Sequence, residues 1–406
     1  MSQNRTSPEV RKLLALSTLA RLPLAMLSIG LLIHAARLTG SFAAAGAAVA
    51  AFAAAQSLGG PILGRWIDRH GQARLLAAAA GCSSTTLLVL AALPPGVPVA
   101  AVVALAGLTG AALPPVGACM RALMPGLVDR SAIDAAYVAE ATASELAFVS
   151  GPPLTLLAVT MTSTAVALAA TAGLLGLSTL GFAMQPAARA WRPAPRPHRD
   201  RSGALRSPAV RTLVAAFGLV GLLFGGVEVA VAATGGTAPT ATVGALLGLW
   251  GVGSLVAGLV MTRIGGTPRH PARLVLVLAA LSAGHLALAA VAGAPVALAG
   301  VLLVAGAAIS PLYAMVNAMV EDAAPRGTTT EAFAWLATAL GTGNAIGAAL
   351  AGAVAERHGA ALAFLLAGSA GLVATVLVAV RARCLTSAPA DLERSRCGGA
   401  RQVLAG

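Results

Sequence analysis

The chain has 406 residues, of which 58% are hydrophobic and 10% charged, with a mean hydropathy of +0.85. A soluble domain of this composition would expose far more apolar surface than soluble monomers carry, so a soluble fold is excluded. The formal net charge is +13. Apart from Arg21, Arg37 and Arg357, the basic residues lie in the N-terminal segment, alternate loops, the centre and the C-terminal tail. This alternation follows the positive-inside rule and requires no nucleic-acid partner.

The apolar runs predict twelve membrane-spanning helices, because each is close to the ~20 residues that a helix needs to cross a bilayer. The predicted class is an all-α integral membrane protein, multi-pass, with both termini in the cytoplasm. Because a multi-pass chain follows, residues 1–36 are interpreted as an uncleaved first helix rather than a signal peptide. The predicted helices are 13–36, 41–62, 74–93, 98–121, 133–160, 163–185, 209–233, 241–262, 273–293, 295–320, 330–354 and 359–381.

A stretch rich in proline and arginine, residues 186–208, cannot insert into a membrane and divides the helices six to six. The predicted organisation is an N-terminal six-helix bundle over 1–185, a cytoplasmic linker over 186–208 and a C-terminal six-helix bundle over 209–382. The tail, 383–406, has no apolar period to bury and is expected to be disordered. The Arg-heavy, Lys-poor, Ala-rich composition indicates a GC-rich genome and a bacterial inner (plasma) membrane protein.

The two halves repeat weakly at an offset of 196 residues. This offset superposes Pro115 on Pro311 and Gly151 on Gly347, whereas the acids of the first half have no acidic counterparts in the second. Parallel halves of this kind form transporters whose site lies between them near mid-membrane.

A charged motif lies between the second and third predicted helices, where residues 59–76 predict a short loop. The spacing Gly-x-x-x-Asp-Arg-x-Gly-x-x-Arg resembles the signature loop of the major facilitator superfamily. The resemblance covers nearly all of residues 10–382 and is specific at this loop; the alternative is an ordinary basic loop. The predicted gating residues are Gly64, Asp68, Arg69, Gly71 and Arg74.

The resemblance implies two pseudo-symmetric six-helix bundles that transport by alternating access. It also implies that Asp68 caps the positive N-terminus of the eleventh helix, which begins near Thr330, and that Arg69 and Arg74 pair with acids at neighbouring helix ends. A carboxylate at a helix N-terminus is stabilised by the helix dipole. Such contacts would hold the inner side shut while the outer side is open.

Four ionisable residues within the predicted spans are candidates for proton coupling, because charge inside a membrane is costly. Arg21 and Glu140 lie at similar depth and can form an ion pair, either static or coupled to transport. Glu145 lies ~7.5 Å deeper and about 140° around the helix, so the two glutamates cannot face one partner equally. Burial disfavours the charge of a carboxyl that lacks a cation, so such a group can bind and release a proton. Glu145 is the first candidate by depth, and Glu228 is the other.

A Gly151-Pro152 step within the predicted helix 133–160 removes backbone hydrogen bonds and predicts a kink. It resembles the Gly-Pro core of the antiporter signature in the drug-export branch of the superfamily, although most flanking glycines are absent. That branch carries an arginine four residues before a glycine in its fourth helix, where this chain has Ala106 before Gly110. A simple kink without antiport therefore remains an alternative.

Substrate signals are few, because aromatic residues make up only 3% of the chain. An apolar cavity with one or two acids suits a small amphipathic organic compound, including a cationic one. Gln56, Tyr313, Asn317 and Asn344 are candidate cavity residues, and each is equally suited to hydrogen bonding between helices. His285 is interpreted as a packing histidine rather than a proton relay.

The sequence contains no phosphate-binding G-x-x-x-x-G-K-[ST] motif and no metal-ligand cluster, so neither an enzyme nor a cofactor is expected. The expected partners are a small-molecule substrate, protons and membrane lipid, with the chain as a monomer. The predicted function is proton-coupled export. An uptake symporter or an uncoupled facilitator on the same fold remain alternatives, and a non-transporting membrane sensor or scaffold is a remote one.

Overall fold

The computed structural model describes residues 8–129, 132–192, 203–234, 241–264 and 269–386, and all regular secondary structure within these ranges is helical. Within them, 12 helical segments are long and apolar enough to cross a membrane. The elements are α1 (Pro8–Thr39), α2 (Phe42–His70), α3 (Gln72–Ala92), α4 (Val99–Ala111), α5 (Val116–Leu127), α6 (Ile133–Met161), α7 (Thr164–Ala183), α8 (Pro186–Ala190), η1 (Ala204–Arg206), α9 (Pro208–Thr234), α10 (Ala241–Ile264), α11 (Pro271–Ala287), η2 (Leu288–Val291), α12 (Pro295–Gly306), α13 (Ile309–Ala323), α14 (Thr329–His358), α15 (Ala360–Val380) and α16 (Ala382–Thr386).

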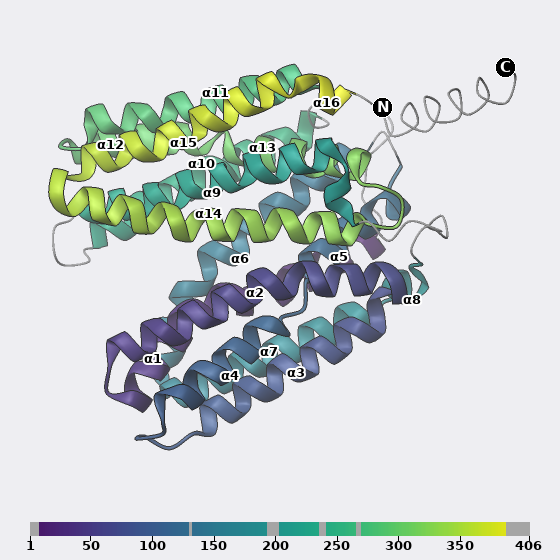
Figure 1. The fold of residues 1–406 in the computed structure, drawn as a ribbon, viewed down its shortest axis with the longest axis vertical. Coiled ribbons are helices and arrows are strands. Elements are labelled where there is room, and N and C mark those ends of the chain that lie inside the picture. The colour runs from purple at the N-terminus through teal and green to yellow at the C-terminus, as the bar shows by residue number, and fades with distance from the viewer. Residues whose placement is uncertain (1–7, 130–131, 193–202, 235–240, 265–268, 387–406) are drawn as a thin grey trace, which may run out of the picture.

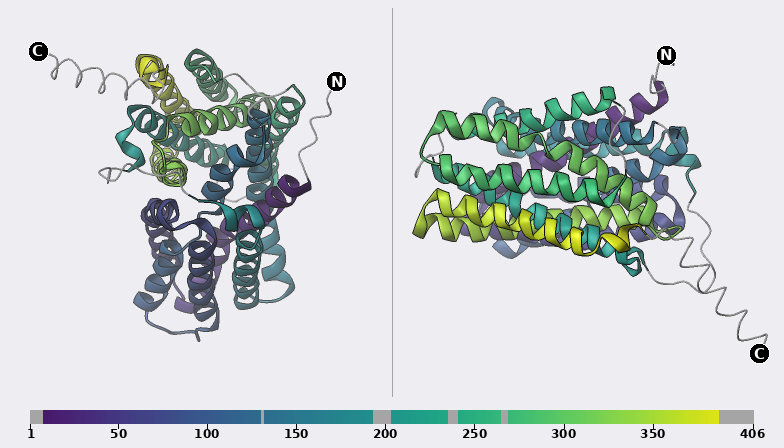
Figure 2. Two further views of the ribbon diagram at one scale, coloured as in Figure 1. Left: turned by 90° about the vertical axis from the view of Figure 1, so that its right-hand side faces the viewer. Right: turned by 90° about the horizontal axis from the view of Figure 1, so that it is seen from above.

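The helices form two bundles that lie side by side, α1 to α7 in one and α9 to α15 in the other (Figures 1 and 2). Within the first bundle α2 packs on α4, α3 on α7, and α1 on α6 and α7. Within the second, α9 packs on α14 and α15, and α10 on α12. Helices α2 and α6 contact the other bundle, through α14 and through α10 and α13 respectively. These pairs form the interface between the two bundles.

The predicted loop over residues 59–76 is wrong, because the structure is helical on both sides of a single residue. Helix α2 continues to His70 and α3 begins at Gln72. Gly71, with φ of 92°, ends α2 by donating its N–H to the carbonyl of Ile67 at 2.8 Å. Glycine reaches positive φ without steric cost, so one residue is enough to turn the chain.

Two predicted helices are each interrupted near a proline. The predicted helix 98–121 consists of α4 and α5, separated by residues 112–115, and the predicted helix 295–320 consists of α12 and α13. Pro115 lies just before α5, and Pro311, its counterpart at the offset of 196, lies in the first turn of α13. Proline has no N–H to donate and is tolerated at a helix start, which explains both breaks.

In each bundle the second and fourth membrane spans approach each other closely at a glycine. A Cβ added to Gly110 would lie 2.1 Å from the carbonyl oxygen of Phe52, and one added to Gly306 would lie 2.1 Å from that of Trp250. The two glycines are 196 residues apart. Each therefore lets the fourth span of its bundle touch the second, as small residues do between helices in lipid.

The predicted linker, 186–208, contains α8 and η1, while its residues 193–202 lie outside the described ranges. The predicted disordered tail begins at residue 383, but α16 continues to Thr386; residues 387–406 lie outside the described ranges. The exact bundle boundaries stay predictions.

Candidate functional site

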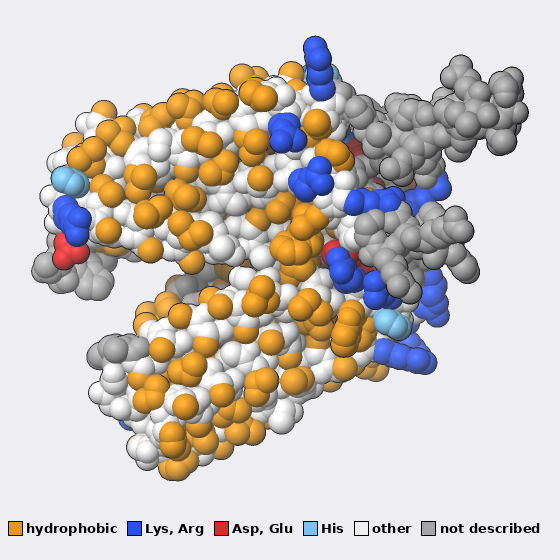
Figure 3. Space-filling view, in the orientation of Figure 1, with side chains coloured by type: hydrophobic (Ala, Val, Ile, Leu, Met, Phe, Trp, Pro, Cys, Tyr) orange, Lys and Arg blue, Asp and Glu red, His pale blue; other side chains and the backbone are white. Residues whose placement is uncertain are grey.

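A cleft separates the two bundles at one end of the molecule, while the bundles meet at the other (Figure 3). We call the end where α1, α9 and α14 begin the closed end, and the opposite end the open end. Basic side chains, arginine or lysine, gather at the closed end on the face shown in Figure 3. Two sets of polar contacts join the bundles at the closed end, and a buried ion cluster lies deeper in the first bundle.

The first set joins α2 to the start of α14. The carboxylate of Asp68, only 2% exposed, accepts hydrogen bonds from the backbone N–H groups of Thr330 at 3.2 Å and Glu331 at 2.8 Å. It thus caps the N-terminus of α14 from another bundle. Arg65 donates to the buried Glu331 carboxylate at 2.7 Å. A Cβ on Gly64 would lie 3.1 Å from the Cα of Glu331, so a side chain at this position would push the two helices a few tenths of an ångström apart.

Two arginines predicted to pair at this junction have no acidic partner among the residues that the structure describes. Arg69 and Arg74 are exposed and make no ion pair with an acid in the ranges that the structure describes, which corrects the expectation from the resemblance. Arg65 makes the ion pair instead. It lies three residues before Asp68, and residues three apart share a helix face, so helical periodicity through the motif could have identified it.

The second set joins α6 to the other bundle through Arg269. Its guanidinium contacts Asp134 at 2.9 Å, Glu321 at 3.6 Å and Asp322 at 2.7 Å. The hydroxyl of Tyr137 on α6 donates to Glu321 at 3.0 Å. Burial lowers the pKa of Arg269, but hydrogen bonds to Asp322 and Asp134 outweigh it and raise the pKa above the ordinary value. Since Asp134 and Tyr137 belong to the first bundle, these contacts also hold the closed end together.

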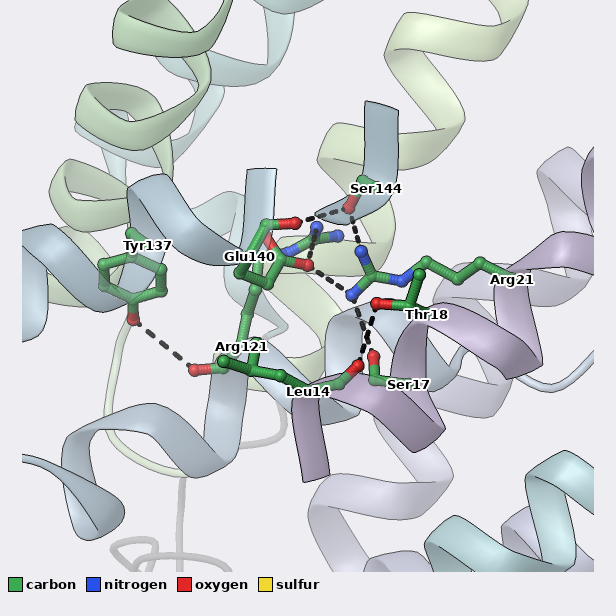
Figure 4. A network of polar contacts seen from close by, with 8 residues as sticks. All are labelled: Leu14, Ser17, Thr18, Arg21, Arg121, Tyr137, Glu140 and Ser144. Carbon is green, nitrogen blue, oxygen red and sulfur yellow. Dashed lines mark hydrogen bonds and ion pairs between the residues drawn. The ribbon is translucent and has the colours of Figure 1, made fainter. Parts of the chain in front are cut away.

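The buried ion cluster brings together α1, α5 and α6 (Figure 4). Arg21 donates to Oε1 of Glu140, which is 1% exposed, and this confirms the predicted ion pair. Arg121 donates to the same oxygen at 3.2 Å. Ser17 accepts from Arg21 at 3.1 Å, and Ser144 both accepts from Arg21 and donates to the Glu140 carbonyl at 2.8 Å. With Glu140 ionised, the cluster carries a net charge of +1.

Arg121 was missed by the sequence reasoning, which ended the helix at that residue. In the structure α5 continues to Leu127, so Arg121 lies within a span. Its guanidinium also lies 5.3 Å from the ring centroid of Phe333 on α14, a cation–π contact between the bundles. The apolar residues that follow, Leu123 and Met124, were the available signal.

The remaining coupling candidates lie apart from this cluster. Glu145 lies on α6, and its side chain is outside the described part of the structure. Glu228 lies in α9, six residues before the helix ends at the open end, is exposed, and hydrogen-bonds to Asn344 on α14. No cation contacts Glu228 within the described residues. The structure therefore brings Glu228 and Asn344 together and pairs Glu140 with two arginines.

The other cavity candidates have separate surroundings. Gln56 is half-buried on α2, and Asn317 is buried on α13. Tyr313 packs edge-on against Phe217, with ring centroids 4.9 Å apart. The Nε2 of His285 accepts from Trp250 at 3.0 Å and its Nδ1 lies 2.7 Å from the Leu281 carbonyl, as expected of a packing histidine.

Gly151 provides close contact between α1 and α6. A Cβ added to it would lie 2.4 Å from the Cβ of Ala25, and one added to Gly347 would lie 2.0 Å from the carbonyl oxygen of Leu222 on α9. Helix α6 is continuous through this region, and the side chain of Pro152 is outside the described part. The predicted kink at Gly151 and Pro152 stays a prediction.

A family model described as Major Facilitator Superfamily matches residues 13–240 and 230–396 of the chain. No curated protein sequence matches it.

Solved structures share the fold at low sequence identity. One is a bacterial homologue of the iron transporter ferroportin in an outward-facing state, with a TM-score of 0.73 and 14% identity over 92% of this chain and 98% of that one. The human organic anion transporter MFSD10 (TETRAN) has a TM-score of 0.63 and 19% identity over 92% and 100%. The proton:xylose symporter XylE bound to 6-bromo-6-deoxy-D-glucose has a TM-score of 0.69 and 14% identity over 92% and 95%.

Proposed function

The chain belongs to the major facilitator superfamily, and from that premise we propose that it is a proton-coupled secondary transporter that exports a small amphipathic organic compound. The family comprises membrane transporters that work by alternating access, so transport itself follows from membership. Direction, coupling and substrate class are the proposed parts. The similar structures do not select a substrate, because their descriptions name iron, organic anions and xylose.

The orientation proposed is that the closed end faces the cytoplasm of a bacterial inner membrane, with the cleft open to the outside. The basic side chains at the closed end support this, since positively charged loops stay in the cytoplasm. The chain is then in an outward-facing state, with residues 186–208 as a cytoplasmic linker between the bundles 1–185 and 209–382.

The observation that carries the mechanism is that polar contacts between the bundles gather at the closed end. Asp68 caps α14, and Arg269 binds an acid on α6 and acids on α13. An inward-facing state requires both sets to break, because each set joins residues of different bundles. Contacts that form in only one of two states shift the balance between them.

Proton coupling is assigned to a carboxyl without a cation. Glu140 contacts Arg21 and Arg121, so its charge is balanced and its role is structural. Glu228 has Asn344 but no cation among the described residues, and the cost of placing an unpaired charge within a membrane span favours the neutral, protonated form of such a carboxyl. Glu145, the first candidate by depth from the sequence, is the second candidate here, because its side chain lies outside the described part of the structure.

Substrate and direction are tested together in inside-out membrane vesicles. A growth screen of a deletion strain against toxic compounds first identifies the substrate. That compound is then added to respiring inside-out vesicles, whose lumen becomes acidic. Export by antiport predicts accumulation in the vesicles that collapses with a protonophore. A symporter would instead deplete the compound from preloaded vesicles, a facilitator would ignore the protonophore, and a sensor or scaffold would move nothing.

A further inference from the structure

A pocket of about 450 Å³ lies at the closed end of the first bundle, between the α2–α3 junction and α8. Its walls include the side chains of His70, Arg74, Arg189 and Arg192 together with the first residues of α3. We propose that this pocket binds the phosphodiester headgroup of an anionic phospholipid. The proposal concerns the lipid and is independent of the transported compound.

The charged side chains among the described residues that line the pocket are all basic. No acidic residue is among its lining residues, whereas three arginines are. Arg74 and Arg189 are exposed and make no ion pair within the described ranges. Arg192 uses Nη1 to donate to the carbonyls of Arg189 at 2.8 Å and Trp191 at 3.0 Å, which leaves its other guanidinium nitrogens available. Guanidinium groups match the oxygens of a phosphate in pairs, so this set suits a phosphate better than a single-atom anion.

Backbone donors add to the arginines. Helix α3 is 21 residues long and begins at Gln72 with no side-chain hydrogen bond capping it. The first residues of α3 line the pocket, and the N–H groups of a first helical turn have no partner within the helix. Donors of this kind complement the oxygens of a phosphate.

The surroundings favour a lipid over a soluble phosphate. The pocket lies where the span of α2 ends at His70 and the span of α3 begins. Two large apolar side chains near the lining residues in the sequence are exposed: Trp66, one helical turn before His70 and 51% exposed, and Met184, at the end of α7, five residues before Arg189 and 68% exposed. Tryptophan is enriched at the headgroup level of membranes. A headgroup in the pocket would thus leave its acyl chains against apolar side chains.

The test is retention of phosphatidylglycerol by the full-length protein, measured by native mass spectrometry after purification from vesicles of equal phosphatidylglycerol and phosphatidylcholine. The pocket variant is R189Q/R192Q. The matched control is R211Q/R273Q, which removes two exposed charges near the starts of α9 and α11, outside the pocket. We expect retained phosphatidylglycerol to fall at least fivefold in the pocket variant and less than twofold in the control. Thermal unfolding verifies that both variants are folded. If the pocket variant is not folded, the single variant R74Q replaces it, and R74Q is also expected to reduce retention of phosphatidylglycerol.

Equal retention by the wild type and the pocket variant would overturn the proposal, as would an equal loss in the control. Inorganic phosphate serves as the second arm. If 10 mM inorganic phosphate displaces phosphatidylglycerol completely, the pocket is a soluble-phosphate site and the lipid assignment is wrong; if retention persists, the lipid source is supported.

Discussion

Asp68 on α2 accepts the backbone N–H of Glu331 on α14 at 2.8 Å, although the two residues belong to different bundles and are 263 positions apart in the chain. This hydrogen bond can exist only while the closed end is shut. Because the carboxylate also accepts from Thr330, it satisfies two amides that α14 cannot satisfy itself. Asp68 therefore stabilises the state in which the closed end is shut, and it gives no such stabilisation to a state in which that end is open.

The substitution Asp68→Asn tests this gain. Asparagine keeps the shape but loses the charge and one acceptor, so the closed state should lose about 1 kcal/mol, or about fivefold in the equilibrium between states. Turnover should fall by a similar factor while the dissociation constant for substrate changes less. Arg69→Gln, on the exposed side of the same helical turn, is the control and should leave both unchanged. Wild-type turnover in Asp68→Asn would contradict the proposed gate.

A substitution at Gly203, near the end of the predicted linker, tests the ion pair between Arg65 and Glu331. A Cβ added to Gly203 would lie 2.2 Å from both Arg65 Nη2 and Glu331 Oε1. Gly203 has a φ of −79°, which any residue adopts, so Gly203→Ala acts through this contact and not through backbone strain. We expect several-fold faster hydrogen exchange in the first turn of α14. Gly126→Ala, where an added Cβ meets nothing within 4 Å, should leave that exchange unchanged, and an equal effect in both variants would contradict the contact.

The buried cluster is predicted to be structural. Glu140→Gln leaves Arg21 and Arg121 without a counter-charge, and the loss of one partner from a buried ion pair costs about 3–5 kcal/mol. The thermal unfolding midpoint of the purified protein should fall by at least about 5 °C. Glu356→Gln removes an exposed carboxylate at the open end and should leave the midpoint in place. A stable Glu140→Gln that has lost only its proton dependence would show that Glu140 carries the proton.

Glu228 is predicted to carry the proton. Glu228→Gln keeps the capacity to hydrogen-bond with Asn344 but cannot ionise, so protonophore-sensitive accumulation in inside-out vesicles should disappear while exchange of substrate at equilibrium persists. Glu145→Gln, measured in the same vesicles, separates the two candidates. Full proton-driven accumulation by Glu228→Gln would reject this assignment.

Much of the fold could be predicted from the sequence, because span length and hydropathy depend on local composition. The pairing of Arg21 with Glu140 was also predicted, since both lie at similar distances from the starts of the predicted helices 13–36 and 133–160, although α1 begins earlier, at Pro8. In these cases the number of residues from the start of a helix gives the depth of a side chain in the membrane.

The hydrogen bonds from the start of α14 to Asp68 agree with the cap that the resemblance implied. The ion pairs of the arginines could not be predicted, because they depend on where helices end and on how the two bundles meet. Arg65 was placed in a loop, whereas α2 continues past it. Arg121 was placed at a helix end, whereas α5 continues to Leu127. Arg269 contacts acids from two bundles, a relationship that no local pattern encodes.

The central claim is that the closed end opens and closes, and it is tested most directly by pulsed electron spin resonance across that end. Spin labels at Arg69→Cys and Arg326→Cys, both exposed and in different bundles, would be attached after the native cysteines are replaced by serine. We predict two distance populations, with the longer one increased by Asp68→Asn. A single distance that neither Asp68→Asn nor substrate changes would contradict alternating access at this interface.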